Sequence, residues 1–227
     1  MDYFQQFLFG IYPYIAGTIF LLGSLIRFER EQYTWKSDSS QLLKQGNLRV
    51  GSILFHVGIL GLFFGHLVGL LTPVAVWDAL GVSHGFKQGF AMAMGGIFGV
   101  SCLIGLLVLL HRRLTEPRIA AQTKFADKLV MIWILLTLLL GLSTIPVSAG
   151  HMDGHMMVVL MTWAQHVVTF KGGAAMIVQS APFVFKLHLF MGMSLFVIFP
   201  FTRLVHIWSG LASVTYLNRA WQLVRTR

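Results

Sequence analysis

Five long apolar runs constrain the fold of this chain more than any other feature of its sequence. A hydrocarbon core of about 30 Å takes roughly 20 helical residues to cross. Predominantly apolar runs of that length lie at residues 4–26, 50–72, 88–111, 128–149 and 182–206. Only 11% of the 227 residues are charged, and the mean hydropathy is +0.74. The sequence therefore predicts an all-α integral membrane bundle of five transmembrane helices, with residues 1–227 forming a single domain.

The lysines and arginines predict how this bundle is oriented. Three of the 17 border one side of the membrane, namely Lys87, Lys171 and Lys186. The other fourteen border the opposite side: Arg27, Arg30, Lys36, Lys44, Arg49, Arg112, Arg113, Arg118, Lys124, Lys128, Arg203, Arg219, Arg225 and Arg227. Because basic residues accumulate on the cytoplasmic side, we expect the N-terminus outside and the C-terminus in the cytoplasm. The net charge of +9 then reflects topology and does not indicate a nucleic-acid-binding surface.

Four histidines lie inside two of the apolar runs, His56 and His66 in the second, His188 and His206 in the fifth. An imidazole in lipid is costly without a partner, so these are candidate ligands. In the expected topology His56 and His206 are both near the cytoplasmic face. His66 and His188 are both near the outer face. Each pair would fill both axial positions of one haem iron, which then transfers electrons and binds no substrate. The alternatives are hydrogen bonds between helices, or proton relay in a transporter or structural anchor.

The spacing of the two pairs is unequal. Eighteen residues separate His188 from His206, which is five whole helical turns, so both would face one direction. Ten residues separate His56 from His66, which leaves them about 80° apart around a helix. These separations correspond to rises of about 27 Å and about 15 Å. Helix tilt, or a kink at Pro200 between the two histidines of the fifth run, has to absorb the difference.

The haems would be of the non-covalent b type, because the sequence has no attachment motif with paired cysteines. Cys102, the single cysteine, lies within the third run, and this count excludes an iron–sulfur cluster or structural zinc site built from this chain alone. Arg203 lies one turn from His206, and Arg112 and Arg113 end the third run at the same depth. These arginines are candidate partners for the propionates of the inner haem, or plain cytoplasmic anchors.

Two further patterns have simpler explanations. The second run carries four glycines at helical spacing: Gly58, Gly61, Gly65 and Gly69. Their stripe lies away from His56 on the helix, which favours close helix packing over room for a macrocycle. His151 and His155 in HMDGH have a spacing that could bind zinc on a helix. Gly154 between them, and the position in an outer loop, favour a solvated surface.

Several segments together resemble one known family over nearly the whole chain. They are IYPYIAG, QYTW, LFHVGILGLFFGHLVGLLTP, STIPVSAGHMDG, WAQHVVTF, LHLFMGMSLFVIFPFTRLVHIWS and YLNRAWQLVR. The combination of FHVGILGLFFGH with FPFTRLVHIW is the most specific part. The chain resembles the gamma subunit of membrane-bound respiratory nitrate reductase.

This resemblance implies a diheme cytochrome b of five helices in the plasma membrane of a bacterium or archaeon. It implies that His66 and His188 hold the outer haem, and that the remaining two histidines hold the inner one. It also implies that menaquinol or ubiquinol is oxidised at the outer face. Lys87 in HGFKQGF matches a lysine implicated in quinol binding, although without the resemblance it reads as a snorkelling interfacial lysine.

The resemblance further implies that electrons pass to a cytoplasmic iron–sulfur beta subunit and then to a molybdenum-containing alpha subunit that reduces nitrate. We expect the tail at residues 207–227 to dock on the iron–sulfur subunit, or alternatively to lie on the membrane surface. A similar cytochrome b subunit feeding a sulfite or heterodisulfide reductase is the alternative assignment.

Overall fold

The computed structural model describes residues 3–31 and 47–209, and every regular element within these ranges is helical. The elements are α1 (Tyr3–Gln6), a π-helical turn (Phe7–Ile11), α2 (Tyr12–Arg30), α3 (Leu48–Leu71), α4 (Val74–Ala79), α5 (His84–Thr115), α6 (Pro117–Ala120), α7 (Phe125–Ala149), α8 (His155–Val168), α9 (Ala174–Ile177) and α10 (Phe183–Ile198). Five helical stretches are long and apolar enough to cross a membrane, which confirms the predicted spans: Tyr3–Arg30, Leu48–Leu71, His84–Thr115, Phe125–Ala149 and Phe183–Phe201. The orientation in the membrane stays a prediction.

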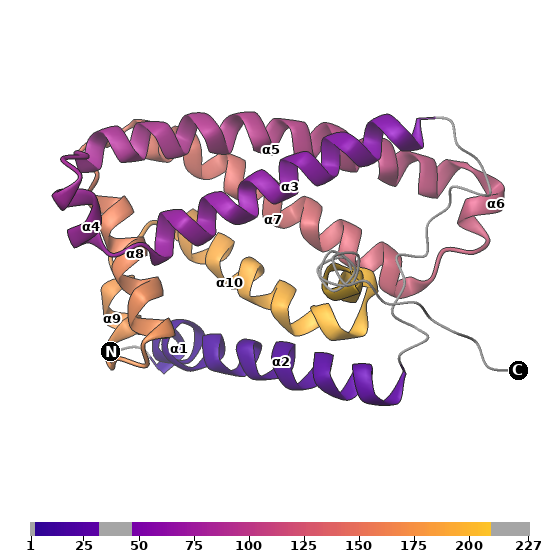
Figure 1. Ribbon diagram of the computed structural model, residues 1–227, viewed down its shortest axis with the longest axis horizontal. Helices are drawn as coiled ribbons and strands as arrows, with labels where there is room; N and C mark the ends of the chain where they lie inside the picture. Colours follow the sequence, from indigo (N-terminus) through magenta and orange to yellow (C-terminus); the bar gives the residue numbers. More distant parts are fainter. Residues whose placement is uncertain (1–2, 32–46, 210–227) are drawn as a thin grey trace, which may run out of the picture.

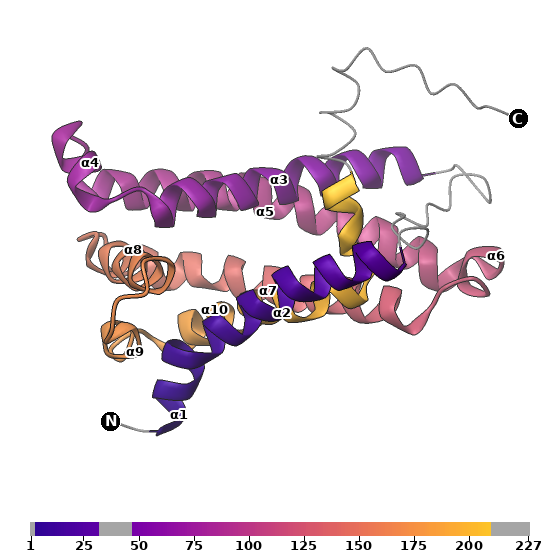
Figure 2. The ribbon, with the colours of Figure 1, turned by 60° about the horizontal axis from the view of Figure 1, so that its bottom comes forward.

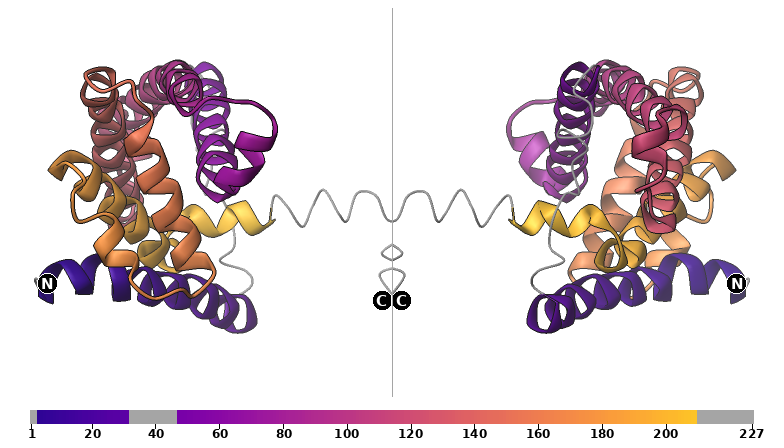
Figure 3. Two further views of the ribbon diagram at one scale, coloured as in Figure 1. Left: turned by 90° about the vertical axis from the view of Figure 1, so that its left-hand side faces the viewer. Right: turned by 90° about the vertical axis from the view of Figure 1, so that its right-hand side faces the viewer.

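The five spans form an arc in which each contacts the next. α3 lies along α5 over the most extensive interface of the described chain, α5 contacts α7, α7 contacts α10, and α10 contacts α2 (Figure 1). Figure 2 shows α3 and α5 together in one layer, with α7, α10 and α2 in a second layer. The end-on views of Figure 3 show the arc closing toward the segment that follows α10. The two histidine-bearing spans are therefore in different layers and face each other across the bundle.

Glycines allow α3 and α5 to approach closely. A Cβ added to Gly58 would lie 2.5 Å from the backbone nitrogen of Cys102, and one added to Gly61 would collide with the ring of Phe98. Helix packing, the interpretation favoured by the sequence, is therefore confirmed for these two glycines. It is wrong for Gly65 and Gly69, because a Cβ there would meet nothing within 4 Å and both residues line a cavity.

The fifth span, predicted over 182–206, is broken at Pro200, where the sequence analysis placed a kink as one way to absorb the unequal spacing. α10 ends at Ile198, a 3-10 turn follows at Phe199–Phe201, and Thr202 is extended with φ −124° and ψ −178°. A second 3-10 turn then covers Arg203–Val205 before the chain becomes helical again at His206. Pro200 causes the break because it has no N–H to donate and its ring clashes with the preceding turn. The argument that five whole turns put His188 and His206 on one face is therefore wrong.

A helix that the sequence did not predict, α8, follows the fourth span in the chain and packs against α3, α5 and α9. It is too short to cross a membrane, and Gln165 on it donates hydrogen bonds of 3.1 Å to the carbonyls of Leu70 and Thr72 at the end of α3. The HMDGH segment leads into α8, where Asp153 accepts a hydrogen bond from the backbone N–H of His155. No group of three potential metal ligands occurs among residues 3–31 and 47–209. Most of the predicted tail at 207–227 lies outside the described residues.

Candidate functional site

The structure brings the four membrane histidines together in the two pairs that topology predicted. The ring centres of His56 and His206 are 6.5 Å apart, and those of His66 and His188 are 6.1 Å apart. A metal–imidazole bond is about 2 Å long and the nitrogen lies roughly 1 Å from the ring centre, so two rings on opposite sides of one ion have centres roughly 6 Å apart. Both separations therefore fit bis-imidazole coordination of a single iron.

The hydrogen bonds of the four rings leave the same nitrogen available on each. Every Nδ1 atom lies against a backbone carbonyl, as follows: His56 on Ser52 at 2.7 Å, His66 on Leu62 at 2.7 Å, His188 on Thr137 at 3.0 Å and His206 on Arg203 at 2.5 Å. A carbonyl oxygen only accepts hydrogen bonds, so Nδ1 carries the proton and donates it. In the neutral ring Nε2 then keeps its lone pair, which is the arrangement that orients a metal-binding histidine. The residues present fit a bis-histidine haem at both positions.

His56 and His206 form the inner pair, named for the predicted cytoplasmic side. They line a cavity of about 380 Å³ together with Arg112, Arg113 and Arg203. The arginines that the sequence proposed as propionate partners are thus brought to the inner histidines. Arg112 and Arg113 are buried near the end of α5, with 7% and 9% of their surface exposed. Three guanidinium groups at one apolar cavity are expected to require anionic partners, because isolated charges are costly away from water.

Asp127, a residue that sequence reasoning missed, supplies one of these negative charges. It lies in the first turn of α7 with 5% of its surface exposed, and its carboxylate accepts a bond of 3.2 Å from Arg113 and one of 2.8 Å from Arg203. The backbone N–H of Lys124 also donates to it at 3.2 Å. The three arginines and this aspartate carry two net positive charges, which would balance the two negative charges of the propionates of one haem. An acidic residue between Lys124 and Lys128, in the mostly basic stretch that follows Arg112, is the signal that could have identified it.

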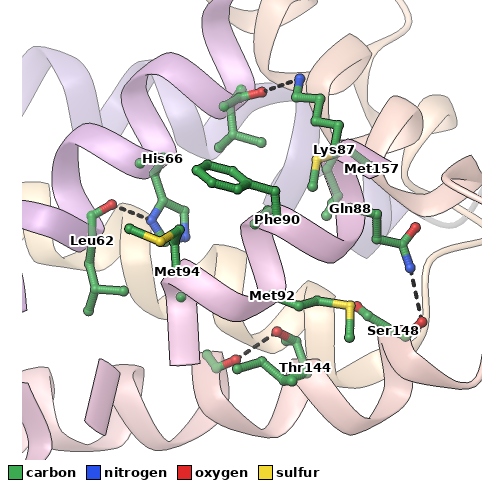
Figure 4. A pocket seen from close by; sticks show the side chains of 18 of the residues that line it. Leu62, His66, Lys87, Gln88, Phe90, Met92, Met94, Thr144, Ser148 and Met157 are labelled. Atoms are coloured by element: carbon green, nitrogen blue, oxygen red, sulfur yellow. Dashed lines mark hydrogen bonds between the residues drawn. The ribbon is translucent and has the colours of Figure 1, made fainter. Parts of the chain in front are cut away.

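His66 and His188, named the outer pair for the opposite side of the predicted topology, line a larger cavity of about 520 Å³. Most of its lining is apolar, with Phe90, Met92, Met94 and Met157 among the side chains seen in Figure 4. Lys87 is the single formally charged side chain among the described residues that line it. This composition suits a large, mostly apolar ligand that is oriented by a few polar contacts.

Lys87 does not snorkel toward the membrane surface. Only 6% of its surface is exposed, and its ammonium donates a hydrogen bond of 3.0 Å to the carbonyl of Gly69 near the end of α3 (Figure 4). The same Nζ atom lies 2.8 Å from the sulfur of Met161 and 4.3 Å from the centre of the Trp77 ring. The carbonyl, the sulfur and the face of the indole ring are all groups that stabilise a cation, and they surround Nζ beside the outer cavity.

Gln88, the next residue on α5, ties this region to α7. Its side-chain NH2 donates to the carbonyl of Ser148 at 2.9 Å (Figure 4) and also to that of His151 at 2.8 Å. These bonds fix the start of α5 against the end of α7. The outer cavity is therefore bounded by three helix ends whose positions are set by hydrogen bonds to backbone carbonyls.

The sequence was compared with known proteins and protein families. The family model described as the nitrate reductase gamma subunit matches residues 5–227. The respiratory nitrate reductase 1 gamma chain of Escherichia coli (strain K12) is 50% identical over 227 residues, covering all of both chains. The respiratory nitrate reductase 2 gamma chain of the same organism is 48% identical, covering all of this chain and 99% of the relative. The nitrate reductase gamma chain of Bacillus subtilis (strain 168) is 34% identical over 222 residues, which is 98% of both chains.

These matches extend across all five spans and include both histidine-bearing segments. They agree with the family that the sequence motifs resemble, and they place the chain in an oxidoreductase complex with other nitrate reductase subunits. This chain has five helices long and apolar enough to cross a membrane, and it matches the family model over residues 5–227. It therefore belongs to the nitrate reductase gamma subunit family.

Proposed function

We propose that this chain is the quinol-oxidising diheme cytochrome b subunit and membrane anchor of its complex. The observation that carries the proposal is the geometry of the two histidine pairs, with ring centres 6.5 Å and 6.1 Å apart and every Nδ1 on a backbone carbonyl. Proton relay, the alternative use of these histidines, needs partners that accept and release protons. A backbone carbonyl cannot pass a proton onward, so the observed bonds favour ligation.

Each cavity would hold one b haem. Bound by two imidazoles and thus without an open coordination position, such groups supply one-electron transfer between the two ends of the bundle. His56 and His206 would hold the inner group, and His66 and His188 the outer one. Arg112 and Arg203 are suited to the inner propionates, because a planar guanidinium forms short, charge-assisted hydrogen bonds with carboxylates. Arg113 shares Asp127 with Arg203 and holds the arginine cluster in place.

The end of the outer cavity around Lys87 is the proposed quinol site, beside the haem that His66 and His188 would hold, and Lys87 is the group that orients the head of the substrate. An ammonium has three N–H donors, and the carbonyl of Gly69 and the sulfur of Met161 occupy two of them. The third can donate to a quinol oxygen. The surrounding methionine and phenylalanine side chains exclude water and suit an apolar ring and tail. We assign no proton-accepting role to His66, since an imidazole bound to iron is a poor base.

The expected topology gives the reaction a direction. Protons from the quinol leave on the outer side, and electrons are delivered to the cytoplasmic side, to an iron–sulfur beta subunit and then to the molybdenum-containing alpha subunit, where nitrate is reduced. The tail at 207–227 is the proposed docking segment for the iron–sulfur subunit. Each elementary charge separated against 100 mV stores about 2.3 kcal/mol. Proton release on the cytoplasmic side, measured in vesicles of known orientation, would contradict this direction.

The assignment of the histidines is tested by counting haems in the purified complex and in two ligand variants. His66→Ala should remove the outer haem and abolish quinol oxidation while the spectrum of the inner haem persists, and His56→Ala should remove the inner haem alone. His155→Ala is the matched control, because His155 is exposed at the start of α8 and should leave both haems in place. Fewer than two haems per wild-type chain, or quinol oxidation that survives His66→Ala, would refute the proposal.

A further inference from the structure

The first span carries no candidate histidine ligand, and none of its described residues lines either cavity. It nevertheless packs against the segment that leads to His206. All described residues that line the two cavities belong to other elements. α2 contacts α10 and the 3-10 turn at Phe199–Phe201, and Figure 1 shows it running alongside α10. We propose that α2 positions His206, with Arg27 as the residue that fixes the broken segment. This inference rests on the proposed function, in which His206 binds the inner haem iron.

One face of α2 matches the break in shape. The face comprises Phe20, Gly23, Ser24 and Arg27, which have the i, i+3, i+4, i+7 spacing of a single helix stripe. The ring of Phe20 packs edge-on against Phe199, with centres 4.8 Å apart, and lies 5.4 Å from the ring of Trp208. A Cβ on Gly23 would lie 2.8 Å from Cγ of Pro200, so the glycine lets α2 touch the proline that breaks the span. The contacts thus begin just before the break and end just after His206.

Arg27 bonds directly to the backbone of the broken segment. Its Nη1 donates to the carbonyl of Pro200 at 2.6 Å and to that of Thr202 at 2.9 Å. Backbone that leaves the helical pattern within a membrane protein requires partners for its carbonyls, because lipid supplies none. A guanidinium satisfies two of them with charge-assisted bonds, and its planar shape fixes their relative position.

The same segment is held from the opposite side by α7. Arg203 bonds to Asp127 at 2.8 Å, and the carbonyl of Arg203 accepts the Nδ1 hydrogen bond of His206. Residues 200–206 therefore lie between Arg27 on α2 and Asp127 on α7. The residues preceding His206 are short turns and one extended residue, so they offer less intrinsic rigidity than the α-helix that carries His56. The position of the His206 ring consequently depends on these two anchors.

The experiment compares haem retention in the assembled complex for Arg27→Met, which removes the donors but keeps an unbranched side chain, and for Arg30→Met as a matched control. Arg30 is exposed on the last turn of the same helix. Haem transfer to an excess of a haem-binding acceptor is followed by absorption, with electron paramagnetic resonance to detect low-spin bis-histidine iron. Loss of a residue that orients a ligand typically weakens metal binding 10- to 100-fold. Arg27→Met should therefore release the inner haem roughly 10- to 100-fold faster, leave the outer haem unchanged, and be partly rescued by Arg27→Lys.

A second pair of variants tests the packing part of α2 without removing a charge. Gly23→Ala forces Pro200 to move and should loosen the same haem, whereas Gly17→Ala is its control because a Cβ there meets nothing within 4 Å. If the complex with Arg27→Met does not assemble, the comparison of Gly23→Ala with Gly17→Ala tests whether α2 positions His206. Equal loosening of both haems, or no change in the variants relative to their controls, would overturn the positioning role. If the complex keeps both haems when His56 or His206 is replaced by alanine, the proposed function is overturned as well. That result differs from a failure of the positioning role, in which the inner haem still requires both histidines.

Discussion

Two glycines on one helix should respond to the same substitution with opposite signs. Gly58 and Gly65 are both in α3, seven residues or about two turns apart, and share one side of the helix. A Cβ on Gly58 would lie 2.5 Å from the backbone nitrogen and 2.7 Å from Cα of Cys102 on α5. A Cβ on Gly65 would meet nothing within 4 Å. Gly58→Ala should therefore destabilise the protein, and Gly65→Ala should stabilise its haem-free form.

The magnitudes follow from the geometry. Ordinary contact begins near 3.4 Å, so Gly58→Ala requires α3 and α5 to separate by about 0.9 Å. Overpacking of this kind costs about 1–3 kcal/mol, and the upper end is expected because the obstructing atoms are backbone and cannot rotate away. Replacing glycine by alanine within a helix returns about 1 kcal/mol. We expect about 2 kcal/mol of net destabilisation for Gly58→Ala and about 1 kcal/mol of stabilisation for Gly65→Ala.

The assay is reversible denaturant unfolding of the full-length chain in mild detergent, with and without haem. Haem-free protein isolates the packing effects, whereas the haem-bound protein tests what occupies the outer cavity that Gly65 lines. If the macrocycle lies against Gly65, the gain from Gly65→Ala should disappear or reverse when haem is bound. Equal destabilisation by both substitutions in haem-free protein would refute the reasoning, because it would mean that the two glycines have equivalent surroundings.

Two further predictions concern charged groups at the cavities. Lys87→Met should raise the KM for quinol roughly 10- to 100-fold, since a hydrogen bond from a charged donor is worth about 1.5–3 kcal/mol, with both haem spectra intact; an unchanged KM in steady-state assays would exclude Lys87 from the quinol site. Asp127→Asn should lower the free energy of unfolding by about 3 kcal/mol, because it leaves Arg113 and Arg203 without their buried carboxylate. The added positive charge should also raise the reduction potential of the inner haem in a redox titration. A loss of stability with no change in potential would limit Asp127 to a structural role.

The spans and the pairing of the histidines could be predicted because they depend on patterns that are local in the sequence. An apolar run long enough to cross a membrane forms a helix whatever its neighbours are, since lipid satisfies no backbone groups. Antiparallel order then determines which histidines share a depth, and the observed pairs, His56 with His206 and His66 with His188, agree with it.

The contacts of Arg27, Asp127 and Lys87 could not be predicted, because they depend on which side chains meet across distant segments. Arg27 counts as one more cytoplasmic arginine in the sequence, but 173 residues separate it from the carbonyl of Pro200 that it binds. Lys87 has the position of a snorkelling lysine, and its burial follows from the carbonyl of Gly69 and the sulfur of Met161 reaching it from α3 and α8. The signal that separates such residues from surface anchors is three-dimensional.

The unequal spacing of the histidines is explained by the position of the break. Ten residues separate His56 from His66 within α3, and ten residues also separate His188 from Ile198, where α10 ends. Both helices therefore rise about 15 Å from the outer histidine toward the inner one. The remaining eight residues of the fifth run pass through two 3-10 turns and the extended Thr202, and they bring His206 within 6.5 Å of His56. A straight helix would have carried His206 about 12 Å further along its axis, beyond reach of its partner. Pro200 is thus required for the inner pair to form. The spacing in the fifth run exceeds that in α3 by eight residues, and these eight residues, 199–206, make up the broken segment that follows Ile198 and ends at His206.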